Sequence, residues 1–263
     1  MNRTNHYRIS SNGVIIGKTD TGERLQISLG HTLIVGATGS GKGSVLWSYL
    51  IGVEHYLDQK QYGLSLLGYD PKRSELAQAE GARFSKVVFE IEDALKLVRM
   101  TVQRMRQRQQ AGTRTFIPTR QEPFTLLVID EFNSLTTAGD TAWRKEIKAN
   151  MMALLSQGRS AGIYIVAAAQ QPQKEAIGDY RQHFMNRICL RVENAMEVDM
   201  VLGAGAVEQG AEAHLIRPAT ESNGYSTAGI GFTRTDAEPR PVRFRAPRIT
   251  DEDIALWCAG GEL

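Results

Sequence analysis

The sequence predicts an α/β protein whose central sheet is mainly parallel and flanked by helices on both faces. Short apolar runs of strand length recur along the chain, and most are separated by segments of helical periodicity. This alternation is typical of parallel sheets, and the near absence of polar residues from the runs indicates strands that are covered on both sides. The runs expected to form strands are 33–35, 64–69, 87–89, 126–129, 163–169 and 188–192.

Residues 1–29 are expected to form an amino-terminal β-hairpin that precedes this sheet. Apolar residues alternate weakly over 14–16 and 25–29, and turn signals lie at 11–13 and 20–22. Residues 30–263 are expected to form one further domain. The reason is that 263 residues, of which 42% are hydrophobic, can bury one sizeable core, and no long linker interrupts them.

Residues 32–44 read TLIVGATGSGKGS, an apolar strand that runs into a glycine-rich loop with a lysine. Glycines let the backbone curl until several N–H groups face one phosphate, and Lys42 adds a mobile charge for the β and γ phosphates. The apolar residues after the loop predict a helix over 44–51, whose amino terminus would favour the same anion. The alternative is a structural glycine turn. The predicted ATP-binding residues are Gly36, Ala37, Thr38, Gly39, Ser40, Gly41, Lys42, Gly43 and Ser44.

One position departs from the usual pattern of such loops. Gly43 follows the lysine, where Ser or Thr normally binds Mg²⁺. Either Ser44 or a water molecule must then take that role, and Ser44 is predicted as a metal ligand together with Asp130.

Asp130 and Glu131 directly follow the apolar run 126–129. Acids at the carboxyl end of a buried strand suit nucleotide hydrolysis, because Asp130 can hold Mg²⁺ and Glu131 can polarise the attacking water. The alternative is a strand that ends in a polar turn. Gln170, which follows the run 163–169, is predicted to sense the γ-phosphate, with a surface turn as its alternative. Arg159 lies in a glycine-flanked turn and is either an exposed residue or an arginine finger that reaches a neighbouring subunit.

Two further segments carry structural expectations. Residues 92–110 predict the longest helix, whose arginines form either a solvated basic face or a DNA-binding face, with solvation favoured. Residues 227–246 predict two closing strands separated at 236–239, and residues 112–122 predict a surface loop. The arginines of the helix are Arg99, Arg104, Arg106 and Arg108.

Composition bounds the compartment and the partners. The formal net charge of +2 neither requires nor excludes nucleic acid, so any basic surface must be local. Cys189 and Cys258 are far apart and show no metal-type spacing, which fits a reducing cytoplasm. The longest apolar runs are well short of the roughly 20 residues of a membrane helix, so no direct membrane span is expected.

The motifs together resemble the FtsK/SpoIIIE/HerA family of DNA-pumping ATPases. The resemblance rests on GATGSGKGS, on the turn that begins at Asp70, on LLVIDE, on QGRSAGIYIVAAAQQP and on the segments 185–192 and 248–254. These motifs are collinear over residues 28–256. The Gly-Lys-Gly-Ser variant and the segments 44–47, 154–159 and 198–203 are most similar to FtsK-like transfer proteins of actinobacterial conjugative plasmids and integrative elements.

The resemblance implies a RecA-like P-loop motor that forms a homo-hexameric ring and moves double-stranded DNA at the expense of ATP, with Mg²⁺. A role in conjugative or mobile-element transfer follows from the plasmid-type likeness. By position, the resemblance gives phosphate binding to Lys42, metal and water activation to Asp130 and Glu131, sensing to Gln170 and the finger role to Arg159. It places Asp70 and Lys72 in a turn near the subunit interface, and Arg187 in a strand without an assigned role.

Departures from the family keep alternatives open. Segment 193–199 is acidic where chromosome translocases often carry basic DNA-contacting residues, so DNA contacts are expected near Lys174 and Arg181 instead. The acidic segment also leaves open an ATPase that powers protein export, as in type VII secretion, and Gly43 leaves open a degenerate nucleotide-binding module. The chain is expected to act in the cytoplasm, either as a minimal motor or beside a membrane-associated or DNA-recognising partner.

Overall fold

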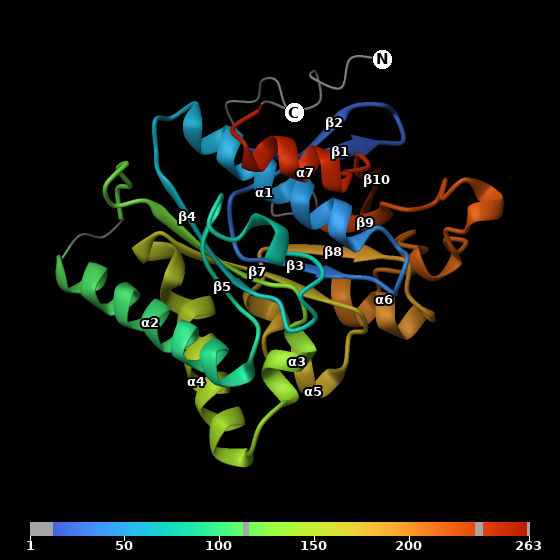
Figure 1. Ribbon diagram of the computed structural model, residues 1–263. Coiled ribbons are helices and arrows are strands. Elements are labelled where there is room, and N and C mark those ends of the chain that lie inside the picture. The colour runs from blue at the N-terminus through green and yellow to red at the C-terminus, as the bar shows by residue number, and fades with distance from the viewer. Residues whose placement is uncertain (1–12, 113–115, 235–238, 262–263) are drawn as a thin grey trace.

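One sheet of ten strands runs through the whole molecule. The computed structural model describes residues 13–112, 116–234 and 239–261, with the side chains of 174–175 excepted. Its strand order is β2-β1-β10-β9-β8-β3-β7-β6-β4-β5, and helices pack on both faces (Figure 1). The predicted α/β class with a mainly parallel sheet is confirmed.

The core of the sheet is parallel and carries the site. Every pairing from β8 across to β5 is parallel, and consecutive partners such as Val35 and Ala169 lie side by side at the same edge. The predicted runs all form strands, and β5, β6 and β8 begin two or three residues earlier than expected. The strands are β3 (Thr32–Val35), β4 (Leu64–Tyr69), β5 (Phe84–Val88), β6 (Phe124–Ile129), β7 (Ile163–Ala169) and β8 (Asn186–Leu190).

The remaining strands extend this sheet in antiparallel fashion beyond β8. They are β9 (Ile230–Arg234), β10 (Val242–Arg245), β1 (Val14–Thr19) and β2 (Arg24–Ile27). The predicted hairpin and the two closing strands are therefore present, and the hairpin joins the main sheet through β10. Residues 1–12, including most of the turn expected at 11–13, and residues 235–238 lie outside the described part of the chain.

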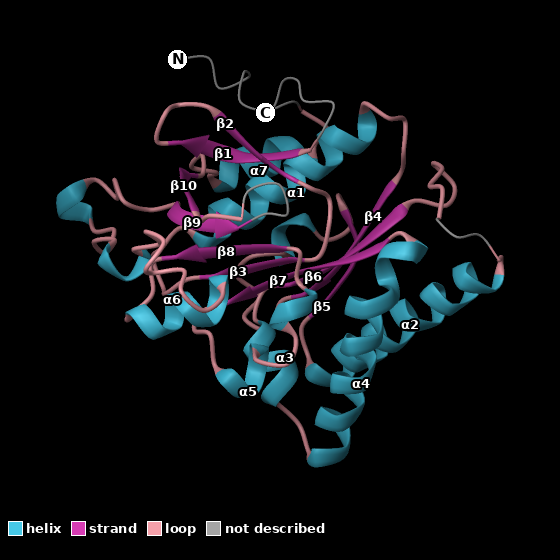
Figure 2. Cartoon of the chain, turned by 180° about the vertical axis from the view of Figure 1, so that it is seen from behind, coloured by secondary structure: helices cyan, strands magenta, loops and turns pink. Residues whose placement is uncertain are grey.

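Helices cover the two faces unequally (Figure 2). One face packs against α1 (Lys42–Asp58) and α7 (Asp251–Cys258). The other face packs against α2 (Ile91–Gln110), α3 (Phe132–Thr137), α4 (Thr141–Gln157), α5 (Lys174–Ile177) and α6 (Ala195–Leu202). Short 3₁₀ helices are η2 (Ala77–Ala79), η3 (Gly158–Ala161), η4 (Arg181–His183), η5 (Ala213–Leu215) and η6 (Glu221–Asn223). No described helix is both long and apolar enough to cross a membrane.

The arginines of α2 mostly make structural contacts. Arg99 pairs with Glu146 of α4, and Arg104 donates to the Thr125 hydroxyl at 3.1 Å. Arg108 donates to the carbonyl oxygens of Ala161 and Pro123. These contacts attach α2 to its neighbours, so Arg104 and Arg108 are neither simply solvated, as the favoured interpretation had it, nor fully available to DNA. Within the predicted loop 112–122, residues 113–115 lie outside the described residues.

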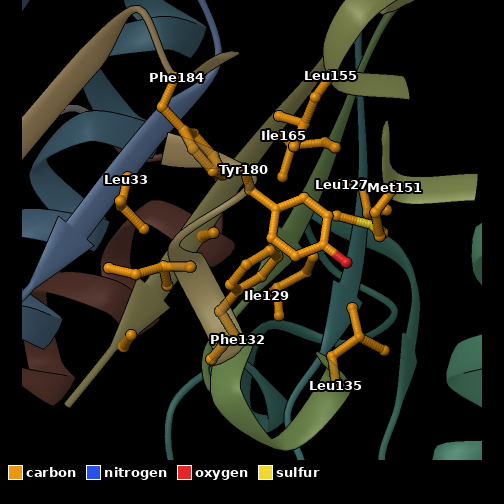
Figure 3. Packing of buried hydrophobic residues seen from close by; sticks show 14 of the residues in the cluster. Leu33, Leu127, Ile129, Phe132, Leu135, Met151, Leu155, Ile165, Tyr180 and Phe184 are labelled. Carbon is orange, nitrogen blue, oxygen red and sulfur yellow. The ribbon is translucent and has the colours of Figure 1, made fainter. Parts of the chain in front are cut away.

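A buried cluster fixes the segment that follows β6. Phe132 is fully buried, and its ring lies edge-on to Tyr180 and Phe184, with centroid distances of 5.3 and 6.0 Å. Figure 3 shows the Phe132 and Tyr180 side chains near Ile129. Phe132 is the first residue of α3, so this packing holds the two residues just before it, Asp130 and Glu131, at the carboxyl edge of the sheet.

Candidate active site

The glycine-rich loop lies at the carboxyl ends of three adjacent parallel strands. Gly36 N–H donates to the Ala169 carbonyl oxygen of β7 at 3.1 Å, and Ala37 N–H donates to that of Arg191, just after β8, at 2.8 Å. Gly39 and Gly41 have φ values of 75° and 88°, a region that favours glycine, as the sequence predicted. The loop leads directly into α1, whose first residue is Lys42. The structure thus places Lys42 and the helix amino terminus together, in the arrangement that binds phosphate.

A distant segment supports this loop from outside. Gly229 N–H donates to the Ser40 carbonyl oxygen at 2.8 Å, and a Cβ on Gly41 would lie 2.3 Å from the Gly229 nitrogen. Gly41 must therefore be glycine for two reasons, its positive φ and this close backbone approach. The first reason was evident from the sequence, and the second was not.

Asp130 and Glu131 follow β6 at the same edge of the sheet as the loop, which lies two strands away at the end of β3. Both side chains are buried, with 6% and 8% exposure. Burial is the main cause that raises the pKa of Asp130, and the charge of Lys42 opposes it. The lysine of the loop and the first acid are thus electrostatic neighbours.

Glu131 makes one ion pair and leaves one oxygen unpaired. Its Oε2 lies 3.1 Å from Nζ of Lys72, whose side chain is half exposed. Its Oε1 is buried and has no hydrogen-bond partner among the described residues. An unpaired buried carboxylate oxygen is costly unless a ligand or water completes it, so Oε1 is the oxygen of Glu131 that is open to such a partner. The Lys72 contact was not foreseen from the sequence.

The turn after β4 is organised by Asp70, whose side chain is fully buried. Its two carboxylate oxygens accept hydrogen bonds of 2.9–3.3 Å from consecutive backbone N–H groups, those of Ser74, Glu75, Leu76 and Ala77. A carboxylate bonded in this way fixes the path of the backbone. The turn therefore holds Lys72 toward Glu131 and Glu75 toward the start of α1.

Glu75 is a residue that no sequence motif singled out. Trp47 of α1 donates its indole N–H to Oε1 of Glu75 at 2.5 Å. Burial, followed by the charge of Asp130, raises the pKa of Glu75 to about 7, while the Trp47 bond and the charge of Lys42 act in the opposite direction. A carboxyl group thus stands beside the two predicted site residues Lys42 and Asp130.

Ser44 points elsewhere in this structure. Its hydroxyl group accepts a hydrogen bond from Ile249 N–H at 3.2 Å and lies 3.5 Å from the Ile249 carbonyl oxygen. Its assignment to Mg²⁺ stays a prediction. Within the described residues no group of three or more His, Cys, Asp or Glu side chains could bind a metal by itself. Mg²⁺ in phosphoryl-transfer sites needs only one or two carboxylates in addition to the phosphates, so the assignment of Asp130 to Mg²⁺ also stays a prediction.

Gln170 and Arg159 lie at opposite ends of β7. Gln170 follows its last residue, next to the loop, and is half buried. Arg159 lies in η3, just before its first residue, and is exposed. A strand of seven residues spans about 20 Å, so Arg159 is far from the phosphate loop of its own chain. This separation is compatible with action on a neighbour, and both roles stay predictions.

The acidic segment 193–199 serves its own backbone. Glu197 accepts the N–H of Glu193 at 2.9 Å, and the Asp199 carboxylate accepts those of Gly205 and Val207. One Arg181 nitrogen donates to the carbonyl oxygens of Asp199 and Met200, so part of the donor capacity of that predicted DNA-contacting residue is used internally. The side chain of Lys174 lies outside the described residues.

A pocket of about 440 Å³ adjoins the loop on the side of α1. Ser44 lies at its edge, and segments 224–229 and 245–249 form most of its wall, including Tyr225, Arg245 and Arg248. Its size suits a small ligand group.

Comparison with known proteins gives a consistent family. A profile described as FtsK/SpoIIIE family matches residues 5–121. "DNA translocase FtsK" of Treponema pallidum is 30% identical over 94% of this chain and 31% of its own length, and the protein of that name from Agrobacterium fabrum is 26% identical over 75% and 26%. The chain thus spans about a third or less of these relatives.

Two solved structures have the same fold. One is the pCW3 conjugation coupling protein TcpA, described as a monomer form with ATPgS, with a TM-score of 0.73, 23% identity and coverage of 94% of this chain and 69% of that one. The other is the cytoplasmic domain of the type VII secretion ATPase EccC of Thermomonospora curvata, with a TM-score of 0.69, 21% identity and coverage of 95% and 30%. These two likenesses concern the fold. The 30% identity to the Treponema pallidum protein over 94% of this chain, with the FtsK/SpoIIIE profile over residues 5–121, establishes that the chain belongs to the FtsK/SpoIIIE family of P-loop ATPases.

Proposed function

We propose that this chain is the ATP-hydrolysing motor of a double-stranded DNA translocase. The observation that carries the proposal is the convergence of Lys42, Asp130 and Glu131 at the carboxyl edge of the parallel sheet. Phosphoryl transfer needs positioning and charge neutralisation more than covalent chemistry, and these three side chains supply both.

Each residue has a separate task in hydrolysis. Lys42 and the backbone N–H groups of the loop bind the phosphates of ATP. Asp130 would hold Mg²⁺, which would supply positive charge to neutralise the phosphates. Glu131 orients the attacking water and takes its proton at Oε1, the oxygen that lacks a partner, while Lys72 holds Oε2. Gln170 contacts the γ-phosphate from the end of β7.

The motor is proposed to act as a homo-hexameric ring. The support is the place of Arg159, which is exposed and about 20 Å from its own phosphate loop along β7. In a ring with head-to-tail contacts, that arginine can complete the site of the next subunit.

DNA is the proposed substrate because the matched relatives at 24–30% identity carry the name DNA translocase FtsK. Use in conjugative or mobile-element transfer follows from the motif likeness in the sequence and from the structural likeness to TcpA, a conjugation coupling protein. We place the motor in the cytoplasm, recruited to a membrane or to its DNA by a partner protein.

A second candidate is an ATPase that powers protein export. The specific observation in its favour is the likeness to the type VII secretion ATPase EccC, together with the acidic segment 193–199. Glu197 and Asp199 already bond to the backbone, however, so the acidic character of this segment is a weaker argument against DNA than its sequence suggests.

The discriminating experiment is the ATPase rate with and without linear duplex DNA. We expect stimulation by duplexes of unrelated sequence, and binding that weakens steeply as salt rises, because the contacts would be to phosphates. Lys42→Ala serves as the inactive control, and electron micrographs of the same sample report rings. A rate that is indifferent to DNA, together with a flat salt response, would favour a protein substrate.

A further inference from the structure

Position 43, where Ser or Thr normally supplies a hydroxyl group to Mg²⁺, is a glycine in this chain. A Cβ built on Gly43 would lie 2.7 Å from both carboxylate oxygens of Glu75. That spacing is shorter than real Cβ contacts, so a serine or threonine at 43 would require the Glu75 carboxylate to move from its present place. The carboxylate of Glu75 therefore occupies the space where the missing side chain would stand.

Glu75 is held in this place from two sides. Its backbone N–H donates to Oδ2 of Asp70 at 3.0 Å, which fixes the turn, and Trp47 donates to its Oε1 at 2.5 Å. Oε2 accepts no hydrogen bond from any described residue. One oxygen is thus used to orient the group, and the other remains available to a ligand.

The charges around Oε2 of Glu75 favour a bound cation. Glu75 and Asp130 are both within electrostatic reach of Lys42 and of each other. When Glu75 is ionised, it and Asp130 together carry one more charge than Lys42 neutralises, and a bound cation would favour that ionised form. A triphosphate placed beside them would be repelled unless a divalent cation stood between, and oxygen ligands of this kind are those that Mg²⁺ prefers.

We propose that Glu75 replaces the absent hydroxyl at position 43 and binds the Mg²⁺ of the Mg–ATP complex, either directly or through one metal-bound water. Gly43 is then the residue that makes room for this carboxylate. The inference rests on the proposed ATPase function, since it concerns the metal of the same site.

The test compares nucleotide binding with and without metal. Affinity for a non-hydrolysable ATP analogue is measured by calorimetry over a range of Mg²⁺ concentrations and again in the presence of a chelator. For Glu75→Gln, whose amide oxygen can still accept from Trp47, we expect about tenfold or greater loss of affinity with Mg²⁺ and no loss without it. Glu80→Ala, which removes an exposed acid at the end of the same segment, should behave as the parent in both conditions.

A pair of further variants examines the exchange of ligands. Gly43→Ser alone should weaken Mg²⁺-dependent binding, because the new side chain meets Glu75. Gly43→Ser combined with Glu75→Ala frees that space and supplies the hydroxyl group, so we expect it to recover metal dependence relative to Glu75→Ala.

The outcomes separate this inference from the proposed function. If the parent binds the analogue in a Mg²⁺-dependent manner and Glu75→Gln shows the same dependence, Glu75 is not a metal ligand, and the ATPase assignment stands. An equal loss with and without metal also overturns the inference, since it marks a purely structural role. Failure of the parent to bind the analogue at all would instead refute the proposed function.

Discussion

Replacement of Asp70 tests whether one buried carboxylate organises the turn that carries Lys72 and Glu75. In Asp70→Ala the backbone N–H groups of 74–77 lose their acceptor. The N–H group of Leu76 is buried, and a buried donor without an acceptor lowers the free energy of unfolding by about 1–3 kcal/mol. The other N–H groups are partly buried and recover some bonding to water, so the total loss in unfolding free energy is about 3–5 kcal/mol. This is a large share of the stability of an ordinary domain.

A graded variant sharpens this test. In Asp70→Asn the amide oxygen can replace Oδ2 and keep its three N–H donors, while the NH₂ group opposes only Ser74 N–H. We expect a loss of about 1–2 kcal/mol for this change. Both values come from urea unfolding followed by far-ultraviolet circular dichroism.

A matched control is available on α2. Asp93 is an exposed acid that pairs with Lys96 at 2.8 Å, and Asp93→Ala should leave the unfolding free energy unchanged within error. If Asp70→Ala unfolds within about 1 kcal/mol of the parent, the claim that these hydrogen bonds organise the turn is refuted.

Three further predictions concern the nucleotide site and its surroundings. Lys42→Ala should abolish ATP hydrolysis and weaken ATP binding without unfolding the sheet, whereas Glu131→Gln should retain ATP and lose turnover; hydrolysis by Lys42→Ala at the parent rate would refute the site. Arg159→Ala should bind ATP and lose about 10³-fold in turnover. In rings that contain Arg159→Ala and Glu131→Gln subunits in equal numbers, ATP hydrolysis should recover to about one quarter of the parent rate, because about one interface in four pairs an intact Glu131 with an intact Arg159. No recovery in demonstrably mixed rings would refute action in trans. Burial, followed by the charges of His183 and Arg159, lowers the pKa of His31 from 6.5 to about 4. Because the unfolded chain then binds a proton more readily than the folded one, the free energy of unfolding should fall by about 3 kcal/mol between pH 7 and pH 4. In His31→Asn the free energy of unfolding should depend less on pH over this range.

The strands were predictable because burial on both faces leaves long apolar runs in the sequence, such as 163–169. The phosphate loop and the acid pair were predictable for a related reason. Each lies on one short contiguous segment whose spacing carries the chemistry, as for Lys42 with its glycines and for Asp130 with Glu131.

The contacts that complete the site were not predictable in the same way. Lys72 with Glu131, and Gly43 with Glu75, join segments that are 59 and 32 residues apart (131 − 72 and 75 − 43). No local pattern encodes such a pair, because each segment taken alone gives no sign of the partner that it meets in the fold. Even Asp70, whose turn was noticed, gave no sign in the sequence that its carboxylate would accept four backbone donors.

The contact between Gly41 and Gly229 means that the phosphate loop is built from two pieces of chain, 188 positions apart (229 − 41). A graft of residues 36–44 onto another α/β scaffold would transfer the whole motif but not the segment around Gly229, just before β9, that contacts the loop. Such a chimera would present the loop without the support that sets its curvature. A transfer of this phosphate-binding loop to another protein should therefore include the segment around Gly229. In libraries of variants, Gly41 and Gly229 should be kept or changed together.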